Sequence, residues 1–413
     1  MGNDTAIREP SRDQVSGKSV AWALGVTDSE SGSRMTLLKK AMMLRGEGVE
    51  RGNALLKLLD RYIGIPAVAT LALFRSRRRY PADVRCIGLL KTVAIGDTVL
   101  LSGPLYDLRD AFPNVRVIVF TGGSNYEAAR LFVQAGEVVR LKMTNVVGAI
   151  RRIRQERLDL LFDFGSWPRV DALLAQASGA FTVGFRSKGQ FRHYGYDRSV
   201  AHSGDVHELE NYRNLLRACG IRAFHEPRIQ SLGPASSYAW VSRKFVVFHL
   251  WPGGYRSDLK TWPSANWIRL IHEFTRKGYT VVLSGAPSDY EKNERIIRSV
   301  SGRPGEEIVN FAGNPLQELV RILSQARLVV SVDTGVMHVA AALDAPLVAL
   351  HGPSPAKRWG AIGKQAIVIE SSLPGCGYLN FGWEYPRVPP PCMEAISYES
   401  VKEACARAVS ALE

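Results

Sequence analysis

Residues 328–360 read LVVSVDTGVMHVAAALDAPLVALHGPSPAKRWG and carry most of the information about the fold. The stretch opens with a largely apolar run that is typical of a buried strand, and Asp333, Thr334 and Gly335 then predict a tight turn into a helix. A second apolar run at 346–350 predicts the next strand. Strands that alternate with helix-length segments are the pattern of βαβ units, so this stretch predicts a parallel sheet covered by helices.

The same alternation continues on both sides of this stretch and divides the chain in two. A segment without periodicity, 226–243, separates the halves and reads as a linker. We therefore predict an α/β fold with two Rossmann-like, doubly wound domains at 84–225 and 244–396, facing a cleft, and a C-terminal helix at 397–413. The predicted strands are 85–90, 115–120, 138–141, 158–162, 181–184, 245–250, 280–284, 308–311, 328–332 and 346–350.

Composition excludes several classes of protein. The chain has 413 residues, of which 46% are hydrophobic and 22% charged, values that exclude a disordered, collagen-like or multi-span membrane protein. The formal net charge of +14 favours an anionic partner, which is a nucleic acid, a lipid surface or a phosphorylated small molecule. Basic and aromatic residues are not interleaved as in RNA-binding modules, so we expect no nucleic acid. Five cysteines argue against a disulfide framework and favour a reducing cytoplasm.

Residues 1–83 precede the alternating pattern and are predicted to form an N-terminal helical extension. Residues 1–14 lack the basic flank and apolar run of a secretory signal. The apolar run 62–74 is too short to cross a bilayer, which takes about 20 residues. An arginine cluster follows it, so the extension is either a helix on an anionic membrane surface or a helix packed on the main body with a solvated basic end. The cluster consists of Arg75, Arg77, Arg78 and Arg79.

The turn after the strand at 328–332 has the features of a phosphate site. Free N–H groups and the helix dipole favour a phosphate at a helix N-terminus, and Gly335 permits close approach of the backbone. Asp333 can accept hydrogen bonds from sugar hydroxyls, and His338 can donate one to a phosphate oxygen. The alternative is purely structural: Asp333 or Thr334 caps the helix, and His338 is an ordinary histidine at a helix start.

Two further loops after strands add candidate ligands. Gly352 lies in a short polar loop, HGPSP, after the strand at 346–350, so it belongs to the same predicted pocket. Lys260 lies in a glycine-containing loop, 251–263, and suits a diphosphate leaving group, although an ordinary surface lysine is the simpler interpretation.

Asp97 is the candidate general base. It stands at the start of a helix predicted over 98–112, on the other side of the expected cleft from the phosphate site. An aspartate there is either a helix cap or a carboxylate that removes a proton from an attacking hydroxyl.

Together these residues resemble glycosyltransferase family 9, the lipopolysaccharide heptosyltransferases and their relatives. The resemblance covers residues 84 to about 411 and is strongest in SVDTGVMHVAAALDAPLVALHGPSP at 331–355. Three shorter motifs support it in the same order: LKTVAIGDTVL at 90–100, LKTWPSANW at 259–267 and VVLSGAP at 281–287.

The resemblance implies a GT-B architecture and an inverting, metal-independent glycosyltransferase. The enzyme would move a sugar, heptose by default, from a nucleotide-diphosphate sugar to a lipopolysaccharide-type or other envelope saccharide. The donor is a substrate, ADP-linked by default, and no cofactor or metal is implied. By resemblance Asp97 is the base, Lys260 binds the diphosphate, and the sugar and phosphate contacts come from Asp333, Thr334, Gly335 and His338.

Some positions remain open. An acidic residue after the GAP turn contacts donor in such enzymes, and both Asp289 and Glu291 fit. The acceptor side is less defined: Arg186, Lys188 and Arg192 form either an anionic-acceptor site or a solvated basic loop. We expect a cytoplasmic protein at the inner face of the inner membrane. Two alternatives share the architecture, a nucleotide-sugar 2-epimerase and a non-catalytic sugar-binding relative. Cys376 and Cys392 alone are too few for a four-thiolate metal site.

Overall fold

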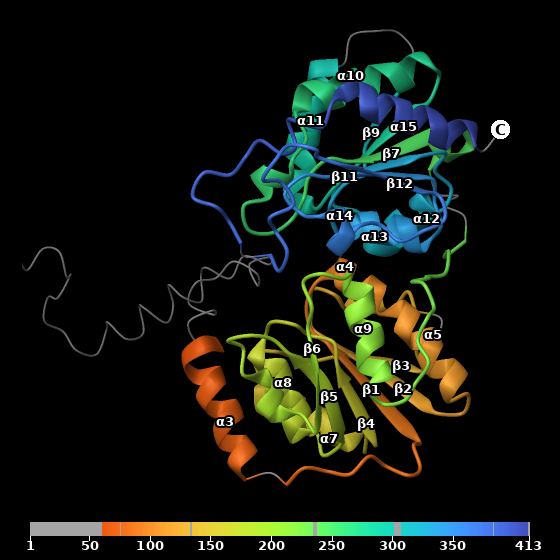
Figure 1. Ribbon diagram of the computed structural model, residues 1–413. Helices are drawn as coiled ribbons and strands as arrows, with labels where there is room; N and C mark the ends of the chain where they lie inside the picture. The colour runs from red at the N-terminus through yellow and green to blue at the C-terminus, as the bar shows by residue number, and fades with distance from the viewer. Residues whose placement is uncertain are drawn as a thin grey trace, which may run out of the picture. The chain divides into compact units, whose positions relative to one another are not determined.

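Two six-stranded parallel sheets make up the centre of the structure, which is a computed structural model (Figure 1). The expectations for residues 1–14 and for Arg75 lie outside the residues that the structure describes, as does part of the predicted linker. The described residues are 60–74, 76–132, 134–233, 238–300, 307–382 and 384–411.

The first sheet has the order β3-β2-β1-β4-β5-β6. β1 is buried along its whole length, and its Leu89 lies opposite Val119 of β2 and Phe162 of β4. Apolar side chains on both faces of a parallel sheet must be covered, and the helices after each strand cover them. The strands are β1 (Cys86–Lys91), β2 (Arg116–Thr121), β3 (Glu137–Arg140), β4 (Leu160–Asp163), β5 (Phe181–Arg186) and β6 (Arg198–Ala201). The helices are α4 (Ile95–Leu100), α5 (Ser102–Ala111), α6 (Tyr126–Ala129), α7 (Val146–Gln155), α8 (Arg169–Ala177), η2 (Arg192–Gly195) and α9 (Glu208–Arg217).

The second sheet repeats this topology with the order β12-β11-β10-β7-β8-β9. Its strands are β7 (Phe245–His249), β8 (Thr280–Ser284), β9 (Ile308–Asn310), β10 (Val329–Val332), β11 (Leu347–His351) and β12 (Ala366–Glu370). The helices are η3 (Ala239–Ser242), η4 (Ser257–Lys260), α10 (Ser264–Arg276), η5 (Pro287–Asp289), α11 (Tyr290–Val300), α12 (Leu316–Leu323), α13 (Gly335–Ala342), α14 (Ala356–Trp359) and α15 (Tyr398–Ser410).

The strand order reverses beside the first strand of each sheet. In the first sheet the reversal lies between β1 and β4, and in the second between β7 and β10. Loops at the carboxyl ends of strands on either side of such a switch point are where open α/β sheets bind ligands. The loop before α4 and the turn before α13 both start from these positions, and α4 and α13 pack against each other.

The structure corrects the predicted elements in three places. β6 and β12 are additional strands at sheet edges. The helix expected over 98–112 is two helices, α4 and α5, with a break at Leu101. Pro104 has no N–H to donate to the preceding turn, which explains why one continuous helix does not form. Because α4 begins at Ile95 with Ala94 as its N-cap, Asp97 lies inside the first turn and is not the cap.

The described part of the N-terminal extension packs on the first half. A π-helical turn, η1 (Asp60–Gly64), leads into α3 (Ile65–Leu73), which lies beside α8 in Figure 1 and contacts both α8 and η2. Val68 is buried, and Asp60 forms an ion pair of 2.5 Å with Arg169. No helix among the described residues combines the length and the hydropathy needed to span a membrane.

Candidate active site

Two glycines allow the start of α4 to touch the start of α13. A Cβ added at Gly96 would lie 2.6 Å from Cδ2 of His338, and one added at Gly335 would lie 2.9 Å from Cβ of Ile95. Neither distance is possible between real side-chain atoms, so both positions require a residue without Cβ. The contact brings the first turn of α4, with Asp97, next to the predicted phosphate turn of the other half.

Asp97 is held by a buried lysine. Lys91, at the end of β1, is only 1% exposed, and its Nζ donates a 2.9 Å hydrogen bond to Oδ2 of Asp97. The same Nζ lies 3.3 Å from the carbonyl oxygen of Phe164. A buried ammonium needs a nearby opposite charge, so this ion pair fixes the orientation of the Asp97 carboxylate. The sequence does not single out this role of Lys91, although a lysine that ends an otherwise apolar strand indicates a buried partner.

Lys260 and Asp333 face each other. The Nζ of Lys260, in η4, is 2.8 Å from Oδ2 of Asp333, directly after β10. Burial would raise the pKa of Asp333, but the Lys260 ammonium, His351 and hydrogen bonds from Lys260 and Ser354 have the larger combined effect and hold it well below its usual range. Asp333 is therefore charged at neutral pH. Two residues that were predicted separately thus meet at one point.

Two buried histidines complete this side of the site. Burial lowers the pKa of His338 to about 4, although the nearby Asp333 and Asp97 carboxylates act in the opposite direction. Burial also lowers the pKa of His351, whose Nδ1 lies 3.3 Å from the carbonyl oxygen of Ser354. Nδ1 of His338 and Nε2 of His351 make no hydrogen bond to any described residue. Both rings are neutral at pH 7, and each has a buried nitrogen without a hydrogen-bond partner among the described residues.

Thr334 is the N-cap of α13. Its hydroxyl accepts a 3.2 Å hydrogen bond from the N–H of Val336, which is the capping interaction that the sequence left open between Asp333 and Thr334. The cap satisfies one N–H of the first turn of α13. Asp333 instead pairs with Lys260, so Thr334 caps the helix and Asp333 forms the ion pair.

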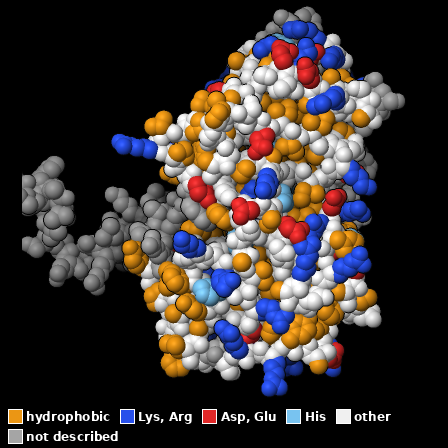
Figure 2. Space-filling view, viewed as in Figure 1, with side chains coloured by type: hydrophobic (Ala, Val, Ile, Leu, Met, Phe, Trp, Pro, Cys, Tyr) orange, Lys and Arg blue, Asp and Glu red, His pale blue; other side chains and the backbone are white. Residues whose placement is uncertain are grey.

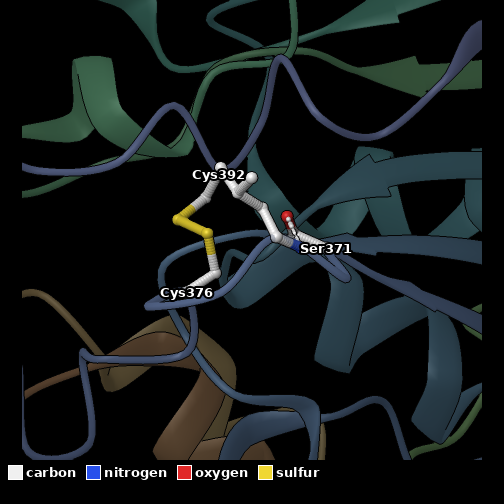
Figure 3. Close-up of a disulfide and its surroundings, with 4 residues drawn as sticks. Ser371, Cys376 and Cys392 are labelled. Atoms are coloured by element: carbon white, nitrogen blue, oxygen red, sulfur yellow. Dashed lines mark hydrogen bonds between the residues drawn. A yellow bond between two sulfur atoms is a disulfide. The ribbon is translucent and has the colours of Figure 1, made fainter.

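Gly352 packs against the loop between β12 and α15, residues 371–397, which a disulfide closes. A Cβ at Gly352 would lie 2.5 Å from Sδ of Met393, and the Gly352 carbonyl accepts a hydrogen bond from the N–H of Gly377. Cys376 and Cys392 are bonded to each other, close to Ser371 at the end of β12 (Figure 3). The chain thus holds one disulfide where a reduced set of cysteines was expected. Cys86, Cys219 and Cys405 are free.

The two acidic candidates after the GAP turn differ in their surroundings. Asp289 is buried, accepts a 3.0 Å hydrogen bond from the N–H of Ala286, and forms an ion pair of 2.8 Å with Lys292. Glu291 is exposed at the start of α11. Asp289 therefore stabilises the turn itself. Among the described residues, no group of three or more His, Cys, Asp or Glu side chains is placed to hold a metal ion.

The three acceptor candidates do not form one cluster. Arg192 is 1% exposed, and its guanidinium pairs with Oδ2 of Asp163 at 2.6 Å. The same carboxylate oxygen accepts a hydrogen bond from the Tyr196 hydroxyl at 2.6 Å. Arg192 is thus a structural cation inside the first half. Arg186 and Lys188 are exposed and remain accessible to a ligand.

A buried ion pair joins the two halves beside the site. Glu208 of α9 and Arg358 of α14 are 2.5 Å apart, and neither side chain is more than 1% exposed. Burial would raise the pKa of Glu208, but His202, Arg358 and Lys91 together outweigh it and lower the pKa to about 2. The residue before Glu208, His207, has its Nε2 3.0 Å from the carbonyl oxygen of Gly360. The sequence shows Arg358 close behind the HGPSP loop but gives no sign of its distant partner.

Comparison with known proteins identifies relatives of this sequence. The model of glycosyltransferase family 9 (heptosyltransferase) matches residues 146–376, which is more than half of the chain. Lipopolysaccharide heptosyltransferase 2 of Salmonella typhimurium is 38% identical over 104 residues, or 25% of this chain and 30% of that protein. The chain therefore spans about a third of the length of the curated relatives that it matches.

Solved structures show the shared fold over a longer range. The ADP-heptose lipopolysaccharide heptosyltransferase II of Escherichia coli has a TM-score of 0.65 at 20% identity, covering 79% of this chain and 99% of its own. A family 9 glycosyl transferase from Veillonella parvula has a TM-score of 0.68 at 19% identity, covering 81% and 100%. With the two parallel sheets, these similarities confirm the predicted GT-B fold.

Proposed function

The chain belongs to glycosyltransferase family 9, and on that basis we propose that it transfers a sugar from a nucleotide-diphosphate sugar to an envelope saccharide. The contact between Gly96 and the α13 turn is the observation that carries the proposal, because it brings a carboxylate of one half to a phosphate-type turn of the other. General-base transfer needs this pairing of a base with a bound donor.

We assign the donor to the second half, with ADP-heptose as the first candidate. The Escherichia coli protein of the same fold is named for that donor. The diphosphate would lie at the N-terminus of α13, where backbone N–H groups and the helix dipole favour anions. Lys260 would supply a cation, and His338, neutral at pH 7, a hydrogen bond. Asp333 would orient Lys260 and accept hydrogen bonds from sugar hydroxyls.

In the proposed reaction Asp97 acts as the general base. Its carboxylate takes the proton of an acceptor hydroxyl while that oxygen forms a bond to the anomeric carbon of the donor. The bond from that carbon to the diphosphate oxygen breaks, and the nucleoside diphosphate leaves with the electron pair. Attack from the face opposite the leaving group inverts the anomeric centre. Lys260 and the N-terminus of α13 stabilise the negative charge that develops, so the scheme calls on no metal or cofactor.

For the acceptor we propose an anionic, lipopolysaccharide-type saccharide at the cytoplasmic face of the inner membrane. The named relatives act on lipopolysaccharide, and the first half offers exposed cations that suit an acceptor with phosphate or carboxylate groups. Arg186 and Lys188 are the two candidates that remain accessible. Arg192, paired with Asp163, is left out of this site.

A donor screen tests the proposal. Ligands that bind only the native state raise the melting temperature, so ADP-, GDP-, UDP- and dTDP-sugars can be ranked by thermal shift. We expect ADP-heptose to give the largest shift and to be consumed only when a saccharide acceptor is present. Epimerised sugar formed without acceptor would instead indicate a 2-epimerase. A shift without turnover on any acceptor would indicate a non-catalytic sugar-binding protein, and no shift at all would contradict the donor site.

A further inference from the structure

α3 has no charged side chain, yet much of it faces solvent. Its sequence is IPAVATLAL, and Val68 is its one buried residue. A helix that is apolar all round is normally enclosed by protein or lipid. Large side chains at both ends of this segment are instead exposed, with Leu73 at 84% and Phe74 at 86% after Tyr62 and Ile63 at the start. Figure 2 shows hydrophobic side chains gathered at this place, over α3.

The apolar surface continues from α3 onto η2. Phe191 and Tyr194 are exposed, and their rings stack with centroids 6.2 Å apart. α3 packs beside η2, and a cavity of about 450 Å³ lies between them. The cavity is lined by Ala69, Ala72, Leu73, Arg77, Tyr194 and Tyr196. We call this continuous surface of η1, α3 and η2 the α3 face. Contiguous apolar patches of this kind mark interaction sites, whereas single exposed residues do not.

The charges around the α3 face are positive. Arg77, Arg78 and Arg79 follow α3 directly, are exposed and form no ion pair with any residue that the structure describes. The neighbouring carboxylates are already engaged: Asp60 pairs with Arg169, and Asp197 accepts hydrogen bonds from the N–H groups of Arg78 and Thr182. An apolar surface with an unopposed positive border is complementary to anionic lipid headgroups over acyl chains.

We propose that the α3 face docks on an anionic lipid bilayer. Leu73, Phe74 and the aromatic rings enter the boundary between headgroups and acyl chains, and the arginines that follow α3 lie at the level of the phosphates. A second copy fits less well, because a two-fold contact through this face would bring its cations together. Residues 1–59 carry a roughly balanced charge, so they do not supply the anionic surface that the border requires.

The inference goes beyond the transfer reaction, since it concerns how the enzyme reaches an acceptor carried by lipid. It depends on neither Asp97 nor the donor turn. Variants of the α3 face should therefore keep the thermal shift that a nucleotide sugar produces, while a failure of the proposed chemistry would leave vesicle binding unchanged.

The experiment is co-sedimentation of the full chain with vesicles of phosphatidylcholine alone and of phosphatidylcholine with phosphatidylglycerol. We expect binding to the anionic vesicles that weakens as salt is raised. The double variant Leu73→Ser, Phe74→Ser should bind at least about tenfold more weakly, because two large apolar side chains no longer enter the bilayer. Arg77→Glu should weaken binding to the anionic vesicles alone. Val388→Ser and Arg298→Glu make matched changes at exposed positions elsewhere and should bind like the unchanged protein.

Every outcome of the vesicle experiment either supports or overturns the proposed docking of the α3 face. Equal binding of the α3-face variants and the two controls would overturn the proposal, as would no binding of the unchanged protein to either vesicle. A concentration-dependent dimer that Leu73→Ser, Phe74→Ser abolishes, without vesicle binding, would assign the face to a second copy and also overturn it. Melting temperatures of all variants, measured alongside, show that each is folded.

Discussion

The Lys91 ammonium lies in the interior of the first half with Asp97 as its partner in charge. Removing one member of a buried pair leaves the other uncompensated, so the geometry of each depends on the other. Lys91 is a positioning residue in this account: it acts through Asp97 and touches no reacting atom. Substitution of Lys91 should therefore lower turnover and leave donor affinity unchanged.

We predict that Lys91→Met lowers kcat by roughly 100-fold while the Kd of the nucleotide sugar changes by less than about twofold. The Asp97 carboxylate loses the hydrogen bond that orients it, but the donor turn is untouched. Steady-state kinetics with isothermal titration of the donor measures both quantities. Lys91→Arg should recover part of the activity, and Lys244→Met, an exposed position, should have none of these effects. Equal losses in kcat and donor affinity would contradict the positioning role.

For Lys260 the expected loss is in donor affinity. Lys260→Met should raise the Kd of the nucleoside diphosphate by about 10- to 100-fold, since a hydrogen bond to a charged group contributes roughly 1.5–3 kcal/mol. Titration with ADP and with adenosine separates the effect on the diphosphate from that on the base. A variant that loses affinity for both equally would show that Lys260 supports the fold of the loop and does not bind the diphosphate.

At the level of single residues, the sequence predicts chemistry where the partners are close in the chain or carried by a motif. The Asp333 to His338 turn follows a recognisable strand, so its composition is informative. Arg192 illustrates the opposite case: its buried partner Asp163 lies 29 positions earlier, at the end of β4, and nothing in the local sequence distinguishes Arg192 from the exposed Arg186. Which cations face solvent depends on tertiary packing, which local composition does not encode.

Among the elements, the junction of α4 and α13 is the most constrained. Any Cβ at Gly335 would overlap the Ile95 side chain and approach the N–H of Gly96. Both contacts involve groups near the backbone, so the steric overlap can be removed only if a whole helix moves.

We therefore predict that Gly335→Ala lowers the free energy of unfolding by about 1–3 kcal/mol and turnover by more than about tenfold. Urea unfolding and the transfer assay measure the two effects. Gly253→Ala is the matched control, because an added Cβ there meets nothing within 4 Å, and its unfolding free energy should change by less than about 0.5 kcal/mol. Full stability and activity of Gly335→Ala would show that the two helices do not need their close contact.

The sequence predicts most of the order of strands and helices, because buried parallel strands are near-continuous apolar runs. The ten predicted strands are all present, with ends shifted by at most two residues or so. β6 was missed because its sequence, RSVA, is short, charged and exposed at the sheet edge. β12 was missed because it follows a turn-rich segment and is only partly buried. Edge strands bury one side only, so their apolar pattern is weak.

For the molecule as a whole, the Glu208–Arg358 pair links the first half to the second at a fully buried point. Replacing both members of such a pair by apolar residues changes the free energy of unfolding little. Removing only one member leaves an unpaired charge in the interior and is strongly destabilising. Because the folded pKa of Glu208, about 2, is below the ordinary value of 4.5, its contribution is complete above pH 4.5 or so and is lost as the pH falls toward 2.

We predict that Glu208→Gln lowers the free energy of unfolding by about 3–5 kcal/mol at pH 7, and that the difference from the unchanged protein shrinks as the pH is lowered through 4 toward 2. Urea titrations across this pH range test it. Glu399→Gln removes one member of the exposed pair with Arg269 and should cost less than about 1 kcal/mol at any pH. A pH-independent difference for Glu208→Gln would show that the carboxylate is not the charged partner of Arg358.

The most direct test of the central claim is the turnover and donor affinity of Asp97→Asn. The proposed base lies in one half of the molecule and the proposed donor site in the other, so turnover and donor affinity should change independently. We predict that turnover with ADP-heptose and a lipopolysaccharide-type acceptor falls by about 10²–10⁴-fold while the donor Kd is unchanged, with Asp110→Asn, an exposed carboxylate on α5, fully active. An Asp97→Asn enzyme that turns over at the unchanged rate, or that loses donor affinity in step with turnover, would contradict it.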